Sequence, residues 1–209
     1  CIIDPGVKLD PGYEKYDEGI AGDYFAKTPE GEVYVNAVWP GDSVYPDFGQ
    51  PKVRKWWAEN QKFLVDLGVR GTWNDMNEPA SFRGELPQDV VFTDEDQKTD
   101  HAAMHNVYGH LMSKATYEGL KEADGRRPFV ITRACYAGTQ KYSTVWTGDN
   151  QSLWAHLRMA VPQLCNLGMS GIAFAGTDVG GFGADCTPEL MCRWVQVGAF
   201  SPLFRNHSS

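Results

Sequence analysis

Several kinds of segment are absent from this chain of 209 residues. It contains no run of 18 apolar residues, so no segment is long enough to cross a membrane as a helix. It contains no Cys-x-x-Cys pair, and its five histidines do not pair with cysteines at ligand spacing, which argues against a zinc site. No glycine-rich loop with a Walker lysine or the dinucleotide spacing follows a predicted strand. We therefore expect no cofactor, no bound metal and no membrane partner.

The chain contains few cysteines, and their number is odd. The five cysteines are Cys1, Cys135, Cys165, Cys186 and Cys192. An odd number without close pairs favours free thiols in a reducing compartment over a disulfide framework. We therefore predict a cytoplasmic location. No signal peptide is recognisable in the chain, but this says little about the longer protein.

The charge balance is acidic, with a net charge of −8. Such a chain repels a polyanion, so nucleic acid is not an expected partner. Hydrophobic residues make up 42% of the chain, which is enough for one domain with a sizeable core. The chain opens inside the apolar run Cys1-Ile2-Ile3 and stops in a polar segment. We expect a piece of a longer protein, whose missing N- and C-terminal domains are its partners.

The segments alternate between strand and helix, which predicts an α/β fold with a parallel sheet covered by helices. Expected strands lie at residues 2–3, 69–73, 129–132, 143–146, 171–175 and 203–204, and expected helices at 51–67, 100–123, 152–167 and 188–200. Residues 7–50 are too long for a plain connection and predict a functional loop or a small inserted lobe. Residues 80–99 are expected to form a solvated loop. His101 and His105 are expected to lie on a solvated helix face.

Polar residues follow each expected strand of this sheet. They are Asp4, Asp75, Arg133, Asp149, Asp178, and Arg205 with His207. A closed barrel of this type has eight strands in about 250 residues, and its chemistry lies at the carboxyl ends of the strands. The six strands fit strands 3 to 8, so residues 1–209 are predicted to be a partial catalytic (β/α)8 TIM barrel, with the long loop or small insert of residues 7–50 after its first strand. An open doubly wound sheet is the alternative, but its phosphate loop is lacking.

The most informative stretch is Gly-Thr-Trp-Asn-Asp-Met-Asn-Glu-Pro at residues 71–79. It begins as a buried strand and ends in the carboxylates of Asp75 and Glu78. Glycosidic bond cleavage usually needs two carboxyl groups, one to protonate the leaving oxygen and one to attack the sugar or activate water. Asp149 ends a second such strand, where Trp146 offers an apolar wall that suits a carboxylic acid keeping its proton. We interpret Asp75 and Asp149 as the pair, although a cap of the following segment also explains Asp75.

Other side chains near the strand ends suit sugar binding. The polar candidates, which can bind sugar hydroxyl groups or supply charge, are Arg133, Asp178, Arg205 and His207. The aromatic candidates, which can stack on a sugar face, are Trp39, Trp73, Trp146 and Phe182. Core packing is the alternative for each aromatic residue, and a turn cap is the alternative for Asp178.

Together these motifs resemble those of glycoside hydrolase family 31, the α-glucosidase family. The matching segments are Trp-Asn-Asp-Met-Asn-Glu at 73–78, Ile-Thr-Arg at 131–133, Trp-Thr-Gly-Asp-Asn at 146–150, Gly-Thr-Asp-Val-Gly-Gly-Phe at 176–182, Arg-Asn-His at 205–207, Trp-Pro-Gly at 39–41 and Ile-Asp-Pro at 3–5. They occur in the family's order and cover nearly the whole chain. Asn74 departs from the pattern, because an aliphatic residue is common at that position.

The resemblance implies a retaining double displacement on a (β/α)8 catalytic domain, without metal or cofactor. By this resemblance Asp75 is the nucleophile, Asp149 is the general acid/base, and Glu78 assists within the nucleophile's motif. The implied sugar-binding residues of the innermost subsite are Arg133, Asp178 and His207, with Trp39, Trp73, Met76, Trp146, Phe182 and Arg205 lining it. The implied substrate is an oligosaccharide or small α-glucoside with a terminal non-reducing α-linked glucose. The linkage, the aglycone, a xylose-type sugar and transglycosylation stay open.

Two other interpretations stay open. Asn77-Glu78-Pro79 also resembles the acid/base motif of retaining β-glycosidases, in which Glu78 would be the acid. That mechanism needs a second glutamate on a later strand, and none lies near Asp178. A non-catalytic carbohydrate-binding protein on the same scaffold would also place aromatic residues beside carboxylates.

Overall fold

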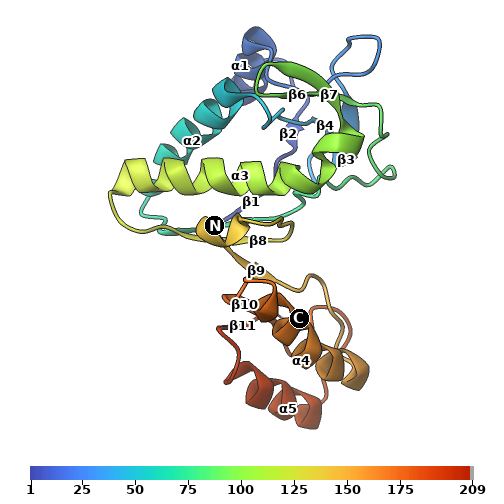
Figure 1. Ribbon diagram of the computed structural model, residues 1–209, viewed down its shortest axis with the longest axis vertical. Helices are drawn as coiled ribbons and strands as arrows, with labels where there is room; N and C mark the ends of the chain where they lie inside the picture. The colour runs from blue at the N-terminus through green and yellow to red at the C-terminus, as the bar shows by residue number, and fades with distance from the viewer. Residues whose placement is uncertain (208–209) are drawn as a thin grey trace. The chain divides into compact units, whose positions relative to one another are not determined.

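Figure 1 shows the computed structural model of the protein, which describes residues 1–207. The chain divides into two compact units, Cys1–Tyr136 and Ala137–Ser209. Each unit contains three parallel strands accompanied by helices, as the predicted α/β class requires. Among the described residues, none of the helices combines the length and the apolar composition that a membrane span needs.

The parallel sheet of the first unit consists of β1 (Ile2–Ile3), β5 (Gly71–Asn74) and β8 (Phe129–Thr132), in the order β1-β5-β8. The helices α2 (Pro51–Asp66) and α3 (His101–Asp124) precede β5 and β8 and pack against each other (Figure 1). These five elements confirm the strands and helices predicted for this part of the chain, apart from small shifts at their ends.

Local signals explain where the two long helices begin and end. Pro51 occupies the first position of α2, where its fixed φ suits a helix and its missing N–H is not needed. The Asp100 side chain caps α3 by accepting a hydrogen bond from the first turn, and Gly125 ends α3 with a φ of 72°. Between the helices, Nε1 of Trp57 donates to Oγ1 of Thr116 at 2.9 Å. The buried faces of the helices are therefore held in a defined register.

Residues 7–50 contain a helix and a small antiparallel sheet. The helix is α1 (Glu14–Gly22), and the sheet pairs β2 (Val7–Lys8), β4 (Gly41–Val44) and β3 (Val35–Val38) in the order β2-β4-β3. Aromatic residues of this segment join the hydrophobic core of the first unit; they are Phe25, Tyr34, Tyr45 and Phe48. These residues therefore form an ordered lobe with a buried interior.

A hairpin that the sequence analysis missed precedes α3. It consists of β6 (Val91–Asp94) and β7 (Gln97–Asp100), and Glu95 in its turn takes a φ of 57°. Both strands contact α3, so His101 at the start of that helix is only 4% exposed. The prediction of a solvated loop is therefore wrong for residues 91–99. The prediction of a solvated helix face is wrong for His101.

The second unit repeats the alternation of strands and helices. Its elements are η1 (Thr139–Lys141), β9 (Thr144–Trp146), α4 (Trp154–Met169), β10 (Ala175–Val179), α5 (Pro188–Gly198) and β11 (Leu203–Asn206). The three strands run parallel in the order β9-β10-β11. Leu157 of α4 packs with Leu190 and the fully buried Trp194 of α5 and with Val179 of β10. This core covers one face of β10.

The strand predicted at 171–175 is displaced in the structure, because β10 spans Ala175–Val179. The prediction ended the strand at Gly176 and the polar residues after it. Gly176 instead lies inside the sheet, where an added Cβ atom would come within 2.3 Å of a backbone oxygen of β11. Asp178 is tolerated in this buried strand because Arg205 of β11 pairs with it. The predicted boundary is therefore wrong, since the neighbouring strand supplies both the close approach and the counter-charge.

Candidate active site

Three ionisable side chains follow the three neighbouring strands of the first unit. The last paired residues of β1, β5 and β8 lie opposite one another, and the residues that come next are Asp4, Asp75 and Arg133. The backbone N–H of Asp75 donates to the Ile3 oxygen at 3.1 Å, and that of Arg133 donates to the Asn74 oxygen at 3.1 Å. The backbone pairing thus continues to the point where the side chains begin, at the carboxyl ends of the strands.

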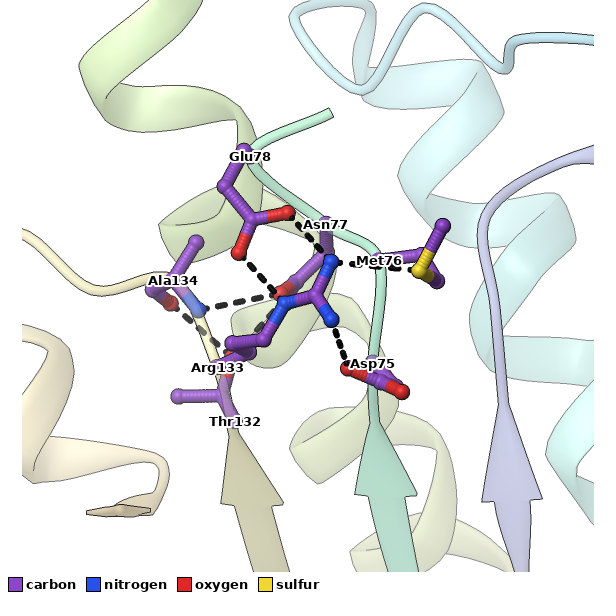
Figure 2. A network of polar contacts seen from close by, with 7 residues as sticks. All are labelled: Asp75, Met76, Asn77, Glu78, Thr132, Arg133 and Ala134. Carbon is purple, nitrogen blue, oxygen red and sulfur yellow. Dashed lines mark hydrogen bonds and ion pairs between the residues drawn. The ribbon is translucent and has the colours of Figure 1, made fainter. Parts of the chain in front are cut away.

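Arg133 is the centre of the polar network in Figure 2. Its Nε donates to Oε1 of Glu78 at 2.7 Å, and its Nη2 donates to Oε2 of the same residue at 2.9 Å. Its Nη1 lies 3.0 Å from Oδ1 of Asp75, and Nη2 lies 3.1 Å from the sulfur of Met76. The Arg133 and Asp75 side chains are 18% and 14% exposed, so water screens their attraction weakly. One guanidinium therefore fixes two carboxylates of the same loop.

The loop that carries Asp75 and Glu78 is fastened to the end of β8 by Asn77. Its Nδ2 donates to Oγ1 of Thr132 at 2.8 Å, and its Oδ1 accepts a hydrogen bond from the backbone N–H of Ala134 at 3.0 Å (Figure 2). Asn77 is fully buried, so leaving either bond unmade would be costly. The amide thus ties the position of the loop to the neighbouring strand.

Asn74, which precedes Asp75, is also fully buried. Its Nδ2 donates to Oγ1 of Thr116 on α3 at 3.2 Å, and Thr116 also accepts the bond from Trp57 of α2. The polar side chain at this position is therefore satisfied, and it anchors the end of β5 to both long helices.

Asp4 is half-buried at the end of β1. Its Oδ1 is buried and has no hydrogen-bond partner within residues 1–207. Burial raises the pKa of Asp4 above its ordinary value, the charge of Asp75 raises it further, and Arg133 opposes the shift. Asp4 is thus a carboxyl beside Asp75 that has no ion pair of its own among residues 1–207.

In the second unit, the loop after β9 carries Asp149, which is exposed, and Asn150, which is half-buried. The Nδ2 of Asn150 donates to Oγ1 of Thr177 at 2.8 Å and to the backbone oxygen of Asp178 at 3.1 Å. Its Oδ1 accepts a hydrogen bond from the backbone N–H of Phe182 at 3.0 Å. The amide of Asn150 therefore ties this loop to β10, as the amide of Asn77 ties the first loop to β8.

Asp178 is fully buried within β10, and its Oδ1 pairs with Nη2 of Arg205 at 2.5 Å. Burial raises the pKa of Asp178, although Arg205 and His207 oppose the shift. Its other oxygen, Oδ2, has no hydrogen-bond partner in the described part of the chain. The Arg205 guanidinium lies 5.2 Å from the centroid of the Trp146 ring, so one face of this nearly buried tryptophan is covered by a cation.

Two further aromatic pairs carry exposed surface. The rings of Phe182 and His207 stack in the second unit with centroids 5.2 Å apart, and Phe182 is 40% exposed. Trp39 and Phe82 meet edge to face in the first unit with centroids 4.9 Å apart, and they are 74% and 53% exposed. Such exposed aromatic faces suit the apolar face of a sugar ring.

The profile of the "Glycosyl hydrolases family 31 TIM-barrel domain" matches residues 1–209. The chain belongs to glycosyl hydrolase family 31. The predicted partial (β/α)8 barrel is thereby confirmed, since the matched domain is a TIM barrel and the structure supplies parallel strands with helices between them.

Curated alpha-glucosidases are similar to the chain over its length. Alpha-glucosidase 2 of Bacillus thermoamyloliquefaciens is 55% identical, over 99% of the chain and 27% of that relative. Neutral alpha-glucosidase C of Homo sapiens is 43% identical, over 100% of the chain and 23% of that relative. The chain therefore spans about a quarter of the length of these relatives.

Solved structures of the family superpose closely. The glucosidase II alpha subunit in its alpha3-Glc2-bound form is 37% identical with a TM-score of 0.93, over 99% of this chain and 23% of that one. A family 31 dextranase of Flavobacterium johnsoniae complexed with glucose is 31% identical with a TM-score of 0.89, over 99% of this chain and 27% of that one. Both structures are named for bound glucose-containing ligands.

The predicted site residues of this family 31 chain fall into two groups. The first unit brings together Asp75, Met76, Glu78 and Arg133, with Trp73 on β5 and Trp39 in the turn after β3. The second unit brings together Trp146, Asp178 and Arg205, stacks Phe182 on His207, and carries Asp149 after β9. Pairing Asp75 with Asp149 stays a prediction. Within residues 1–207, no group of three His, Cys, Asp or Glu side chains is placed to hold a metal ion.

Four residues with contacts at these sites received no role in the sequence analysis. They are Asp4, Asn77, Phe82 and Asn150. The sequence could have predicted a role for the two asparagines. Each lies one or two residues after a candidate carboxylate, and its amide can bridge two strands. No local pattern marks Phe82, since its partner Trp39 lies far away in the sequence.

Proposed function

We propose that the chain is the larger part of the catalytic barrel of a retaining α-glycosidase. In this proposal the full protein is an α-glucosidase that releases terminal non-reducing α-linked glucose from oligosaccharides. The observation that carries the proposal is the Asp75 carboxylate, which follows β5 and lies 3.0 Å from the Arg133 guanidinium. A neighbouring positive charge favours the ionised form of a carboxyl, and the ionised form is the one that attacks.

The mechanism we propose is a double displacement. In the first step, an oxygen of Asp75 bonds to the anomeric carbon while Asp149 protonates the departing glycosidic oxygen. In the second step, Asp149 takes a proton from a water molecule, whose oxygen displaces Asp75 from the anomeric carbon. Asp149 is exposed in its unit, as a group that meets both the aglycone and water must be. Two inversions at one carbon give net retention.

The sugar would be held by polar and aromatic side chains near the strand ends. Asp178 keeps Oδ2 buried without a partner in the described residues, so that oxygen can accept a hydrogen bond from a sugar hydroxyl. Arg205 fixes the other oxygen of Asp178, and a guanidinium is a donor that suits hydroxyl oxygens. The stacked Phe182 and His207 offer an aromatic face beside these groups in the second unit. Trp73, Met76 and Trp146 complete the lining in this proposal.

Trp39 also belongs to the lining of the innermost subsite in this proposal, and Phe82 packs edge to face against it. Both rings are open to solvent on the first unit, and neither is needed by the core. Glucose is the sugar we propose, supported by the printed names of the similar proteins, which include alpha-glucosidases. Since the chain spans about a quarter of these relatives, other domains of the full protein would complete the outer subsites.

A cytoplasmic location belongs to the same proposal. All five cysteines are free in the structure, which supports a reducing compartment. The expected partner is a carbohydrate substrate, and the net charge of −8 opposes nucleic acid.

The β-glycosidase alternative assigns the acid role to Glu78. Both oxygens of Glu78 accept hydrogen bonds from Arg133, at 2.7 and 2.9 Å. With both oxygens engaged by the guanidinium, Glu78 serves this loop as a fixed hydrogen-bond acceptor. The geometry therefore favours Asp75 as the reacting group of this motif.

The test is the configuration of the first product released by the full-length protein. Proton NMR would follow the hydrolysis of an α-linked glucose disaccharide before the product mutarotates. α-Glucose as the first product supports the proposal, and β-glucose contradicts retention. Binding without turnover would favour the non-catalytic alternative, and turnover only of β-glucosides would favour the Glu78 mechanism.

A further inference from the structure

Asp4 is a carboxyl of the first unit that the proposed mechanism does not use. The residues before it and before Asp75 are paired in the parallel register of β1 and β5. The bond from the Asp75 N–H to the Ile3 oxygen keeps the two chain segments together at this point. The two carboxyls therefore leave adjacent strand ends, and one of them is the proposed nucleophile.

Around Asp4, the carboxyl groups outnumber the guanidinium groups that could pair with them. Arg133 lies at the next strand end, and its guanidinium nitrogens contact Asp75 and Glu78 at 2.7 to 3.0 Å. Three carboxyl groups thus share the field of one guanidinium, and Oδ1 of Asp4 is buried without a hydrogen-bond partner in residues 1–207. A buried carboxylate without a partner is costly, whereas the protonated form avoids most of that cost.

The other charged groups near Asp4 are matched among themselves. Asp4 lines a hollow of the first unit together with Lys8, Asp10, Glu14 and Lys15. The Lys8 ammonium pairs with Asp10 at 2.8 Å, and that of Lys15 pairs with Glu14 at 2.9 Å. The electrostatic effects that act on Asp4 come from Asp75, Arg133 and Glu78, after burial itself. Among the described residues, the hollow therefore supplies no counter-ion that would hold Asp4 ionised.

We propose that Asp4 is a positioning residue for Asp75: its side chain stays neutral while the enzyme works, which leaves the Arg133 guanidinium to Asp75 and Glu78. Burial and the charge of Asp75 both raise the pKa of Asp4, in keeping with this role. When Asp4 loses its proton at higher pH, a third negative charge competes for Arg133. The contact between Arg133 and Asp75 then weakens, and attack by Asp75 slows. This inference rests on the proposed role of Asp75 as the nucleophile.

The test uses a reaction that reports on Asp75 without needing the acid/base. The reagent is a 5-fluoro-α-glucosyl fluoride. An oxygen of Asp75 forms a bond to its anomeric carbon while the bond between that carbon and fluorine breaks, and fluoride departs. The second-order rate of this labelling is measured across pH by intact-protein mass spectrometry. The samples are the full-length protein, Asp4→Asn, and the matched control Asp10→Asn. Asp10 lines the same hollow, and its side chain is 48% exposed.

In the unaltered protein, the labelling rate should fall on the alkaline side by more than about threefold, because ionised Asp4 competes for Arg133 and weakens its contact with Asp75. In Asp4→Asn this fall should be absent, and the rate at the optimum should stay within about threefold, because the amide imitates the neutral acid in shape. The acid side of the profile, which reports ionisation of Asp75, should not move. Asp10→Asn should follow the unaltered protein throughout.

Two outcomes overturn the proposal. If Asp4→Asn and the unaltered protein have the same pH profile, Asp4 has only a structural role. If the acid side of the Asp4→Asn profile moves to lower pH, Asp4 is ionised in the working enzyme. If Asp4→Asn fails to fold, the labelling rate of the unaltered protein still tests the proposal. A rate that does not fall on the alkaline side contradicts it. Failure of Asp75→Asn to abolish labelling would instead reject the proposed function, so the two failures are distinguishable.

Discussion

The Asp75 carboxylate lies 3.0 Å from the Arg133 guanidinium, and the same guanidinium binds both oxygens of Glu78. Asp75 and Glu78 belong to the loop after β5, whereas Arg133 begins the loop after β8. The position of the proposed nucleophile therefore depends on Glu78 through Arg133. Glu78 would contribute to the reaction without touching the sugar.

Glu78→Gln should lower kcat/KM by about 30-fold, because losing a charged hydrogen bond to a buried guanidinium costs about 2 kcal/mol. Most of the loss should appear in kcat, since the sugar-binding groups of the second unit are untouched. Steady-state kinetics of the full-length variant provide the measurement. Glu85→Gln is the matched control, because Glu85 is an exposed glutamate of the same connection. Equal activity of both variants would contradict the role of the Arg133 pair.

The loss of activity in Asp149→Ala should depend on how much the leaving group of the substrate needs protonation. Substrates whose leaving group must be protonated should react about 100- to 10,000-fold more slowly, the usual contribution of general acid–base catalysis. Aryl glucosides with strongly acidic leaving groups should form the glycosyl-enzyme nearly normally. Added azide should then restore turnover and give an α-glucosyl azide. An equal loss on both kinds of substrate, or a β-azide, would show that Asp149 is not the acid/base.

Asn150→Ala should affect the same step as Asp149→Ala, but less strongly. It removes two donated hydrogen bonds to β10, worth about 1 kcal/mol each, so activity on demanding substrates should fall about 30-fold. Labelling of Asp75 by an activated fluoride should not change. Ser152→Ala is the control, since the Ser152 hydroxyl lies 2.7 and 3.1 Å from the backbone oxygens of Gly180 and Ala184 and can donate its one proton to either. Ser152→Ala should lower the melting temperature, but its activity should not depend on the leaving group of the substrate. If the activities of Ser152→Ala and Asn150→Ala depend on the leaving group in the same way, the proposed role of Asn150 is contradicted.

The stability of the first unit should depend on pH through His101. Burial lowers the pKa of His101 to about 4, below the ordinary value of 6.5. The folded state therefore resists protonation, and stability falls as pH drops from about 6.5 towards 4, by on the order of 3 kcal/mol. His101→Gln should flatten this part of the curve of melting temperature against pH. His105→Gln, which changes the exposed neighbour, should keep most of the slope, and a slope unchanged by His101→Gln would contradict the assignment.

Much of the first unit could be predicted from local sequence signals. Pro51, Asp100 and Gly125 mark helix ends by conformational preferences that hold in any protein. The carboxyl-terminal positions of Asp75 and Arg133 follow from apolar strands that stop abruptly. The contact between Arg133 and Glu78 could not be predicted in this way, because it depends on the register of β5 and β8.

The errors have the same physical origin. The hairpin of β6 and β7 is rich in charged residues, so its own sequence resembles a solvated loop. Its strands are stabilised by pairing with each other and by contact with α3, which also buries His101. β10 runs through Gly176 and Asp178 because β11 accommodates both residues. In each case a tertiary neighbour overrides the preference of the local sequence.

The most direct test of the account identifies the residue that bonds to the sugar. The full-length protein would be incubated with 5-fluoro-α-glucosyl fluoride, digested, and analysed by tandem mass spectrometry. The account predicts one glycosylated peptide, with the added mass on Asp75, and no adduct in Asp75→Asn. An adduct on Glu78, on another carboxylate, or unaltered turnover by Asp75→Asn would contradict it.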